Sequence, residues 1–254
     1  METLFIGKNL LFLHEVESTN TYAMDLLRNV NAIEGTVVHT DNQTKGKGQR
    51  GALWSSGIAQ NVTTSIILKP QFLNLDQTFY LSKISALAVY DVLADILPVG
   101  QYDIKIKWPN DILVNEQKLA GILIENNFTN SAIQNSVIGI GLNVNQDDFN
   151  DFERTATSLK LLSNTSHSRE EVLERICMKL EKWYLRLKAQ KTNLIDETYL
   201  KHLFGVNELM GFVDDKGNRF NGKILGVTSS GKLLIESGKD GIREFDIKEI
   251  KFSV

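Results

Sequence analysis

A short segment of the chain gathers residue types that could carry out chemistry on a charged substrate. Residues 107–111 are Lys, Trp, Pro, Asn and Asp, so an ammonium, an amide and a carboxylate meet at a bend imposed by the proline. Lys118 follows, at the start of an apolar segment that runs to Ile124. A lysine at the mouth of a buried strand loses its hydration unless an anion meets it, so Lys118 is a candidate for binding an anionic substrate. The alternative is a surface hairpin in which Lys118 extends into water, which is favoured for a lone lysine.

A glycine-rich loop over residues 41–53 is the second candidate. Its residues 46–51 match the G-x-G-x-x-G pattern of dinucleotide-binding proteins, but no helix is predicted after them and no acidic residue stands about twenty positions on. A P-loop is excluded as well, because Ala52 occupies the position of the required lysine. The segment is therefore either a solvated surface loop or a flexible loop whose amides and cations, Lys47 and Arg50, close over a phosphate-bearing ligand.

Two further features could contact a ligand. Gly139 and Gly141 alternate in a predicted strand, which indicates close approach of a ligand or another backbone on one face, or tight packing against a helix. Asn143 shares that face. Trp54, just after the glycine loop, could stack on a planar base, although core packing is the commoner fate of a tryptophan.

Hydrophobic periodicity and turn residues predict the elements that position these groups. Strands are expected at 9–14, 36–40, 62–68, 104–107, 112–114, 119–124 and 137–144, and helices at 22–28, 77–97, 168–188 and near 194–204. Ser18, Thr19 and Asn20 supply helix-capping side chains, and Ser168 with Glu171 forms a capping box.

After residue 205 the pattern changes to short strands and glycine-containing turns. The strands are expected at 209–213, 219–227, 232–236 and 243–247, and the turns at 229–231 and 240–241. We therefore predict an α+β protein, with one domain over residues 1–205 and a small β-barrel over residues 206–254.

Composition narrows the classes of function. The chain has 254 residues and a net charge of −3, so no basic surplus indicates a nucleic-acid partner. No apolar run approaches membrane-spanning length, and the first residues lack a signal-peptide pattern. The single cysteine, Cys177, excludes an internal disulfide and a cysteine-based zinc site. These properties predict a cytoplasmic enzyme or binding protein without a membrane partner.

Taken together, these segments resemble the biotin protein ligases (biotin–[acetyl-CoA-carboxylase] ligases). The resemblance covers nearly the whole chain, and the pair formed by residues 107–111 and 118–122 is its most specific part. The other matching segments, in the family's order, are residues 17–20, Gln43 with the 46–51 loop and Trp54, 139–143, and 156–159. The resemblance implies a mixed-sheet catalytic domain like that of class II aminoacyl-tRNA synthetases, followed by a small SH3-like barrel.

The resemblance implies a reaction in two steps. Biotin and MgATP give biotinyl-5′-AMP and pyrophosphate, and the adenylate then acylates one lysine of a biotin carboxyl carrier protein domain. Lys118 and Lys47 are the implied catalytic residues, and Asp111 is a candidate ligand for Mg²⁺. The implied biotin-binding residues are Ser18, Thr19, Asn20, Gln43, Lys47, Gly48, Gln49, Lys118, Gly121, Leu123, Gly139 and Gly141. The implied ATP- and adenylate-binding residues are Lys47, Gln49, Arg50, Trp54, Asn110, Asp111 and Asn143.

The chain departs from the family pattern in its glycine loop. Family members often carry two arginines there, where this chain has Lys47 and Gln49. Lys47 keeps the charge but lacks the bidentate fork of arginine, and Gln49 has no charge. Whether Arg50 takes over from the second arginine is left open. The family pattern also begins almost at Met1, so we expect a monofunctional ligase without the helix-turn-helix domain of some relatives, and no DNA partner. Bacterial members often dimerise through sheet edges, which leaves a homodimer open.

Two other functions compete with this expectation. A lipoate or octanoate ligase or transferase shares the catalytic fold, but residues 107–111, the loop ending in Trp54 and the C-terminal barrel favour biotin. A noncatalytic biotin-binding regulator is the second alternative. The acidic sequence pI of about 5.9 argues against a repressor.

Overall fold

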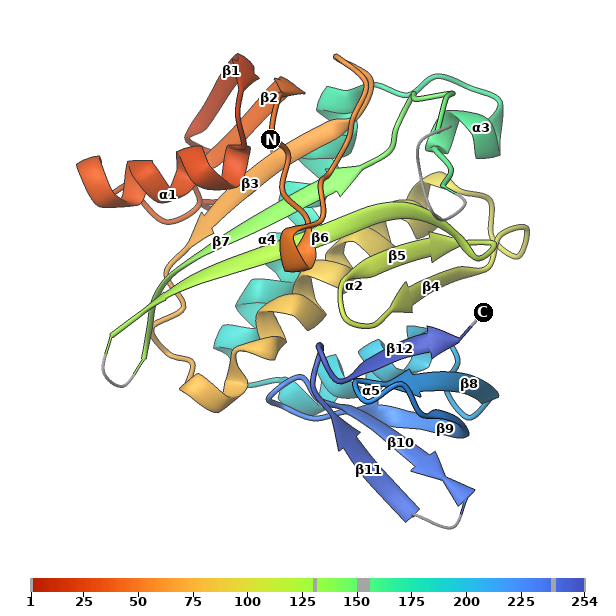
Figure 1. Ribbon diagram of the computed structural model, residues 1–254. Helices are drawn as coiled ribbons and strands as arrows, with labels where there is room; N and C mark the ends of the chain where they lie inside the picture. Colours follow the sequence, from red (N-terminus) through yellow and green to blue (C-terminus); the bar gives the residue numbers. More distant parts are fainter. Residues whose placement is uncertain (1, 130–131, 150–155, 239–240, 254) are drawn as a thin grey trace.

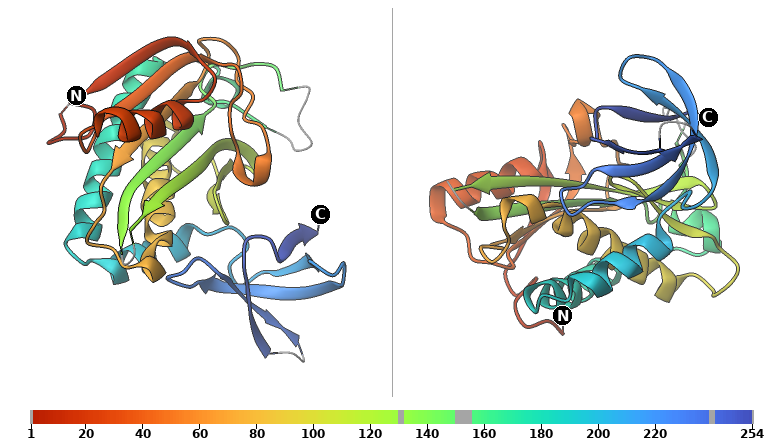
Figure 2. Two further views of the ribbon diagram at one scale, coloured as in Figure 1. Left: turned by 60° about the vertical axis from the view of Figure 1, so that its left-hand side comes forward. Right: turned by 90° about the horizontal axis from the view of Figure 1, so that it is seen from below.

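The computed structural model describes residues 2–129, 132–149, 156–238 and 241–253 (Figure 1). A large mixed sheet with helices on both faces is followed by a smaller antiparallel sheet (Figures 1 and 2). None of the described helices is both long and apolar enough to cross a membrane.

Seven strands form the large sheet, in the order β1-β2-β3-β7-β6-β5-β4. The strands are β1 (Leu10–Val16), β2 (Val37–Gln43), β3 (Val62–Leu68), β4 (Ile104–Lys107), β5 (Asp111–Val114), β6 (Gln117–Phe128) and β7 (Ile133–Leu142). Strands β1 and β2 run parallel, and the other neighbours are antiparallel. Strand β3 is buried at all 7 positions, which suits its β-branched composition.

Alternate residues of a strand face opposite sides of the sheet, and both sides carry apolar residues here. Helices therefore cover both faces. The helices are α1 (Thr19–Val30), α2 (Phe79–Ile96), α3 (Leu159–Ser163), α4 (Arg169–Lys188) and α5 (Thr192–His202), with 3₁₀ turns η1 (Gln49–Gly51) and η2 (Leu75–Gln77). Val38 and Ile67 pack under α1. Their neighbours Val37 and Ile66 belong to the larger core on the other face, under α2 and α4 (Figure 2).

The predicted helices and their faces largely match the structure. Helix α2 buries Leu81, Ile84 and Val92 on the predicted face. Helix α4 begins after Ser168, whose hydroxyl accepts a hydrogen bond from the Glu171 amide, as expected of a capping residue. The turn between β5 and β6 has positive φ at Asn115 and Glu116, which is typical of a two-residue hairpin turn.

Several predicted boundaries were wrong, and pairing explains most of them. Strand β2 extends into the predicted loop because its last residue, Gln43, pairs with Val16 in the parallel ladder. Strand β6 runs on to Phe128 because β7 pairs with it along most of its length. Strand β7 ends before Asn143. Helix α3 and a last strand at 250–253 were not predicted.

The capping prediction at the start of α1 was also wrong in part. Ser18 occupies the N-cap position, but its side chain makes no capping hydrogen bond. Thr19 and Asn20 lie inside the first turn of the helix, where their side chains are free to face the sheet. These side chains therefore serve another purpose than capping.

The last five strands form the antiparallel sheet β11-β10-β9-β8-β12. The strands are β8 (Leu209–Asp214), β9 (Arg219–Val227), β10 (Leu233–Ser237), β11 (Gly241–Phe245) and β12 (Ile250–Ser253). Residue 240 of the predicted 240–241 turn lies outside the described residues. The Trp108 indole donates to the Gly231 carbonyl at 2.9 Å, which fixes this sheet against the large one. A domain boundary at residue 205 stays a prediction.

Candidate active site

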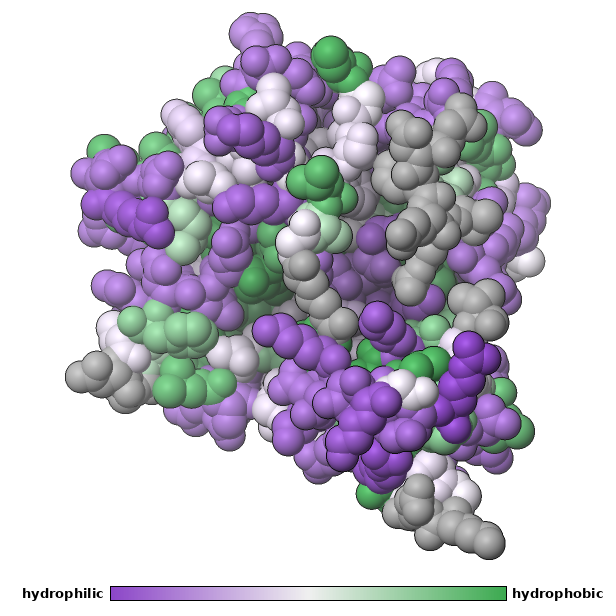
Figure 3. All heavy atoms as spheres, in the orientation of Figure 1, coloured by the Kyte–Doolittle hydropathy of each residue, from purple (hydrophilic) through white to green (hydrophobic). Residues whose placement is uncertain are grey.

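A cleft of about 650 Å³ collects most of the predicted site residues. Its floor is the face of β6 and β7, and its rims are the start of α1, the loop after β2, the 107–111 bend and strand β12 of the small sheet (Figure 1). The space-filling view shows this face, hollowed beside the loop (Figure 3). The described lining includes four lysines, Lys47, Lys107, Lys118 and Lys251, but a single carboxylate, Asp111. The cleft therefore favours an anionic ligand.

The polar groups that line one end of the cleft are uncharged and are linked by hydrogen bonds. The Gln43 side-chain oxygen Oε1 accepts from the Thr19 backbone amide at 2.8 Å and from the Thr19 hydroxyl at 3.0 Å. Ser65 Oγ lies 2.7 Å from Thr19 Oγ1 and 2.6 Å from Asn20 Oδ1. The Asn20 amide nitrogen donates to Glu125 Oε2 at 2.8 Å. This end offers hydrogen bonds rather than charge, which suits an uncharged polar ring.

At the middle of the cleft, Lys118 is paired rather than extended into water. Its Nζ lies 2.7 Å from Asp111 Oδ1, and the Asp111 side chain is only 14% exposed. The pair forms because β5 and β6 are neighbours and Asp111 stands opposite Gly121 in the register. Asn110 is held beside them, since its side-chain nitrogen donates to the Ile122 carbonyl at 3.0 Å. An ammonium, a carboxylate and a fixed bend thus share one wall of the cleft.

The alternating glycines of β7 leave room for side chains from other segments to lie directly against the strand. A Cβ on Gly141 would overlap the Trp54 indole, and a Cβ on Gly139 would overlap the Asn20 amide. On β6, a Cβ on Gly121 would lie 3.2 Å from Trp54 Cζ3. The indole nitrogen of Trp54 is buried without a hydrogen-bond partner among the described residues. Trp54 therefore lies on the glycine floor next to Lys118, whose Nζ is 5.8 Å from its ring centroid.

The glycine loop crosses above this floor (Figure 1). The Gly48 amide donates to the Ala52 carbonyl at 2.7 Å, and Lys47 forms an isolated bridge with Leu53. Lys47, Gly48 and Gln49 line the cleft. The side chain of Arg50 lies outside the described part of the chain. The tip of the loop is thus held by its own backbone, whereas the start of the loop is bonded to the end of β1.

Among the predicted site residues whose side chains are described, only Asn143 does not line the cleft. It is 4% exposed, and its amide nitrogen donates to the Thr157 carbonyl at 3.0 Å. The residues brought to the cleft are Ser18, Thr19, Asn20, Gln43, Lys47, Gly48, Gln49, Trp54, Asn110, Asp111, Lys118, Gly121, Leu123, Gly139 and Gly141.

Sequence reasoning missed three residues at or behind the cleft, namely Ser65, Glu125 and Lys251. Ser65 and Glu125 lie behind Thr19 and Asn20, and only the pairing of β3, β7 and β6 brings them there. Lys251 approaches from the small sheet, and Lys107 of the 107–111 bend approaches from the large one, with its Nζ 4.8 Å from the Phe252 ring centroid. No local pattern marks Lys251, because the strand that carries it was not predicted.

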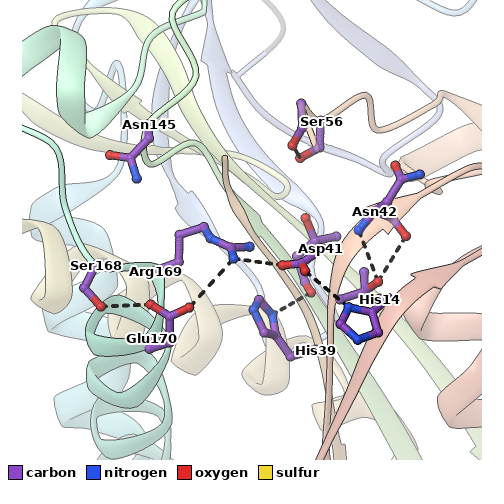
Figure 4. A network of polar contacts seen from close by, with 12 residues as sticks. His14, His39, Asp41, Asn42, Ser56, Asn145, Ser168, Arg169 and Glu170 are labelled. Carbon is purple, nitrogen blue, oxygen red and sulfur yellow. Dashed lines mark hydrogen bonds and ion pairs between the residues drawn. The ribbon is translucent and has the colours of Figure 1, made fainter. Parts of the chain in front are cut away.

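A second polar cluster lies outside the cleft and joins α4 to β2 (Figure 4). Arg169 Nη2 lies 2.8 Å from Asp41 Oδ1. The buried His39 ring contacts the Thr63 carbonyl through Nδ1 at 3.0 Å. Burial lowers the pKa of His39, and the nearby Arg169 guanidinium lowers it further, although the Thr63 hydrogen bond opposes both effects. The cluster anchors the strand whose end carries Gln43.

Comparison with known proteins decides the family. Residues 12–143, more than half of the chain, match the sequence model of the Biotin/lipoate A/B protein ligase family. The chain belongs to this family. The bifunctional ligase/repressor BirA of Bacillus spizizenii is 34% identical over 254 residues, which cover 99% of this chain and 76% of that protein. A biotin–[acetyl-CoA-carboxylase] ligase of Paracoccus denitrificans is 32% identical over 180 residues, or 69% of this chain and 72% of that protein.

Solved structures agree with this assignment. The biotin protein ligase of Aquifex aeolicus, in complex with biotin and ATP, superposes with a TM-score of 0.79 at 26% identity. The match covers 97% of this chain and 99% of that one. The resemblance to biotin ligases and the α+β fold class expected from the sequence are therefore confirmed. Closure of the small sheet into an SH3-like barrel stays a prediction.

Proposed function

We propose that this member of the family activates biotin with ATP to biotinyl-5′-AMP and transfers biotin to a lysine of a biotin carboxyl carrier protein domain. One observation carries the proposal most: a single cleft holds a neutral hydrogen-bonding end and a lysine-rich part, joined at Lys118. Biotin has an uncharged ureido ring and a carboxylate, and ATP adds phosphates. The order of groups along the cleft matches that of the two substrates.

The neutral end binds the ureido ring in this proposal. Thr19, Asn20 and Gln43 offer both donors and acceptors, which a cyclic urea needs. A lipoyl group carries a dithiolane ring with neither an N–H group nor a carbonyl, so the amino group of Gln43 would find no acceptor on it. The polar chain therefore favours biotin over lipoate within a family that includes ligases for both.

Lys118 stabilises the adenylation step. The biotin carboxylate attacks the α-phosphorus of ATP, the bond to the bridging oxygen breaks, and pyrophosphate leaves with the electron pair. Negative charge builds on the phosphoryl oxygens, and a fixed ammonium next to them lowers the barrier by about 3–4 kcal/mol if it acts like other preorganised donors. Asp111 holds the ammonium in position before the substrates arrive.

The remaining residues take supporting roles. Lys47 and Gln49 close over the adenylate, Trp54 packs against its base, and Asn110 and Asp111 contact ATP. Asp111 suits the Mg²⁺ that accompanies ATP, because this ion is commonly held by one or two carboxylates together with substrate phosphates. In the transfer step, the carrier lysine amine attacks the acyl carbonyl of the adenylate and AMP leaves. A cytoplasmic location is part of the proposal.

Pyrophosphate exchange into ATP tests the proposed function. With MgATP and labelled pyrophosphate, label should enter ATP when biotin is present and not when lipoate replaces it. Omitting the carrier domain isolates the first step. Exchange that depends on lipoate, or that ignores biotin, would contradict the proposal.

A further inference from the structure

We infer that Glu125 is a positioning residue that fixes the hydrogen-bonding direction of the ureido site and thereby contributes to its selectivity. Glu125 lies on β6 behind Asn20, outside the lining of the cleft. It acts through Asn20 rather than on the substrate. The inference rests on the proposed biotin-binding role of the neutral end of the cleft.

The orientation of the Asn20 amide follows from its partners. Its nitrogen faces Glu125 Oε2 at 2.8 Å and the Leu123 carbonyl oxygen at 3.3 Å. A carboxylate and a backbone carbonyl can only accept, so both hydrogens of the Asn20 amide point to β6. The amide oxygen then faces Ser65 and the glycine floor at Gly139. In this orientation Asn20 can offer a ligand only an acceptor.

The orientation of the Gln43 amide is fixed in the same way from the other end. The backbone N–H of Thr19 can only donate, so the atom 2.8 Å away must be the Gln43 oxygen. The Gln43 amino group is left without a hydrogen-bond acceptor among the described residues. Gln43 lines the cleft and therefore presents a donor to the ligand.

Ser65 connects these two amides. Its hydroxyl has one hydrogen, and the Asn20 oxygen at 2.6 Å can only accept it. The Thr19 hydroxyl then supplies its own hydrogen to Gln43 Oε1 at 3.0 Å or to Ser65 Oγ at 2.7 Å. From Ser65 onward each group donates to the next, and the chain ends on the Glu125 carboxylate. An anion at the end of such a chain strengthens the bonds before it.

The resulting pattern is acceptors from Thr19 and Asn20 and a donor from Gln43. A cyclic urea has the complementary pattern of two N–H groups and one carbonyl. Because Ser65 is 0% exposed and Asn20 is 3% exposed, these directions are set before a ligand binds. Without Glu125, the Asn20 amide could rotate and offer its amino group instead of its oxygen.

The test measures binding of biotin and of its two carbamate analogues, in which a ring oxygen replaces one or the other ureido N–H. Wild-type protein should reject the analogue whose ring oxygen faces Asn20. Glu125→Ala should weaken biotin binding roughly tenfold to a hundredfold, as expected for losing a hydrogen bond to a charged group. The same variant should bind the rejected analogue nearly as well as biotin, while the KM for ATP stays unchanged. Glu125→Gln keeps a neutral acceptor and should restore much of the discrimination.

Controls distinguish the positioning role of Glu125 from a loss of structure in the variant and from an error in the proposed function. Glu236→Gln removes an exposed carboxylate on β10, outside the cleft lining, and should change neither affinity. If Glu125→Ala unfolds, Glu125→Gln must still lower the ratio of biotin affinity to rejected-analogue affinity below that of wild-type protein, because its neutral oxygen is a weaker acceptor than a carboxylate. Equal weakening for biotin and both analogues would overturn the inference and leave the proposed function intact. Absence of biotin binding by wild-type protein would instead overturn the proposed function.

Discussion

At the scale of single residues, glycines make room for the aromatic side chain on the cleft floor. Gly141 and Gly121 stand opposite each other on β7 and β6, and the Trp54 indole lies across both. Any side chain at Gly141 would occupy the same space as the ring. The position of Trp54, and of the nucleotide base expected to pack on it, depends on this bare patch of backbone.

A methyl group at Gly141 should therefore displace Trp54. We expect Gly141→Ala to raise the KM for ATP and to shift the tryptophan fluorescence, with a cost of about 1–3 kcal/mol typical of overpacking. Gly121→Ala is the matched variant, since its Cβ would meet the ring at 3.2 Å and a small shift would suffice. Equal KM values for Gly141→Ala and wild-type protein would count against this role of the floor.

At the scale of elements, strand β2 links the proposed ureido site to the polar cluster at the start of α4. Gln43 ends the strand, and Asp41 and His39 precede it on alternate positions. Asp41 pairs with Arg169 at the start of α4, next to the buried His39 ring (Figure 4). The geometry at Gln43 thus depends on how well α4 and β2 are joined.

Acid should weaken this junction. The pKa of His39 is lowered from 6.5 in the folded protein, mainly by burial, so the unfolded chain binds a proton first as the pH falls. Between pH 6.5 and the lower folded pKa, the free energy of unfolding should decrease as the pH falls, by at most about 1.4 kcal/mol per pH unit from this group. Burial also lowers the pKa values of His167 and His202, and they add to the trend.

Urea unfolding at pH 7.5 and pH 5.5 measures this effect. His39→Asn keeps a donor for the Thr63 carbonyl but cannot titrate, so it should lose less stability between the two pH values than wild-type protein. If the free energy of unfolding of His39→Asn depends on pH as that of wild-type protein does, the role given to His39 is wrong.

At the scale of the whole molecule, sequence patterns predicted most strands and helices but not how distant segments meet. Periodicity located β3 and β9 at their observed bounds because each has clear turn residues on both sides. Strand β12 has only 4 residues and gains its partner, β8, from a segment about forty positions earlier, so no local signal marks it. The same reason hid Lys251, Ser65 and Glu125, whose positions at the cleft depend on strand order rather than on spacing.

The two sheets should also depend on each other for stability. Trp108 is 3% exposed and its indole nitrogen donates to the Gly231 carbonyl of the small sheet. Trp108→Phe keeps an aromatic ring but leaves that buried carbonyl unpaired, so it should reduce the free energy of unfolding by about 1–3 kcal/mol in chemical denaturation. Trp183→Phe is a matched control, because its indole donates to Asp91 within the helical layer. Trp183→Phe should leave the KM for ATP unchanged, whereas Trp108→Phe should raise it.

Formation of the enzyme-bound adenylate tests the central claim most directly. Wild-type protein and Lys118→Ala, both shown to be folded, are incubated with biotin and MgATP without a carrier domain, and the bound product is identified by mass spectrometry. Wild-type protein should accumulate biotinyl-5′-AMP, and Lys118→Ala should form it roughly a hundredfold to a thousandfold more slowly, the cost of losing one preorganised donor. Absence of biotinyl-5′-AMP from wild-type protein, or its formation at the wild-type rate by Lys118→Ala, would contradict the account.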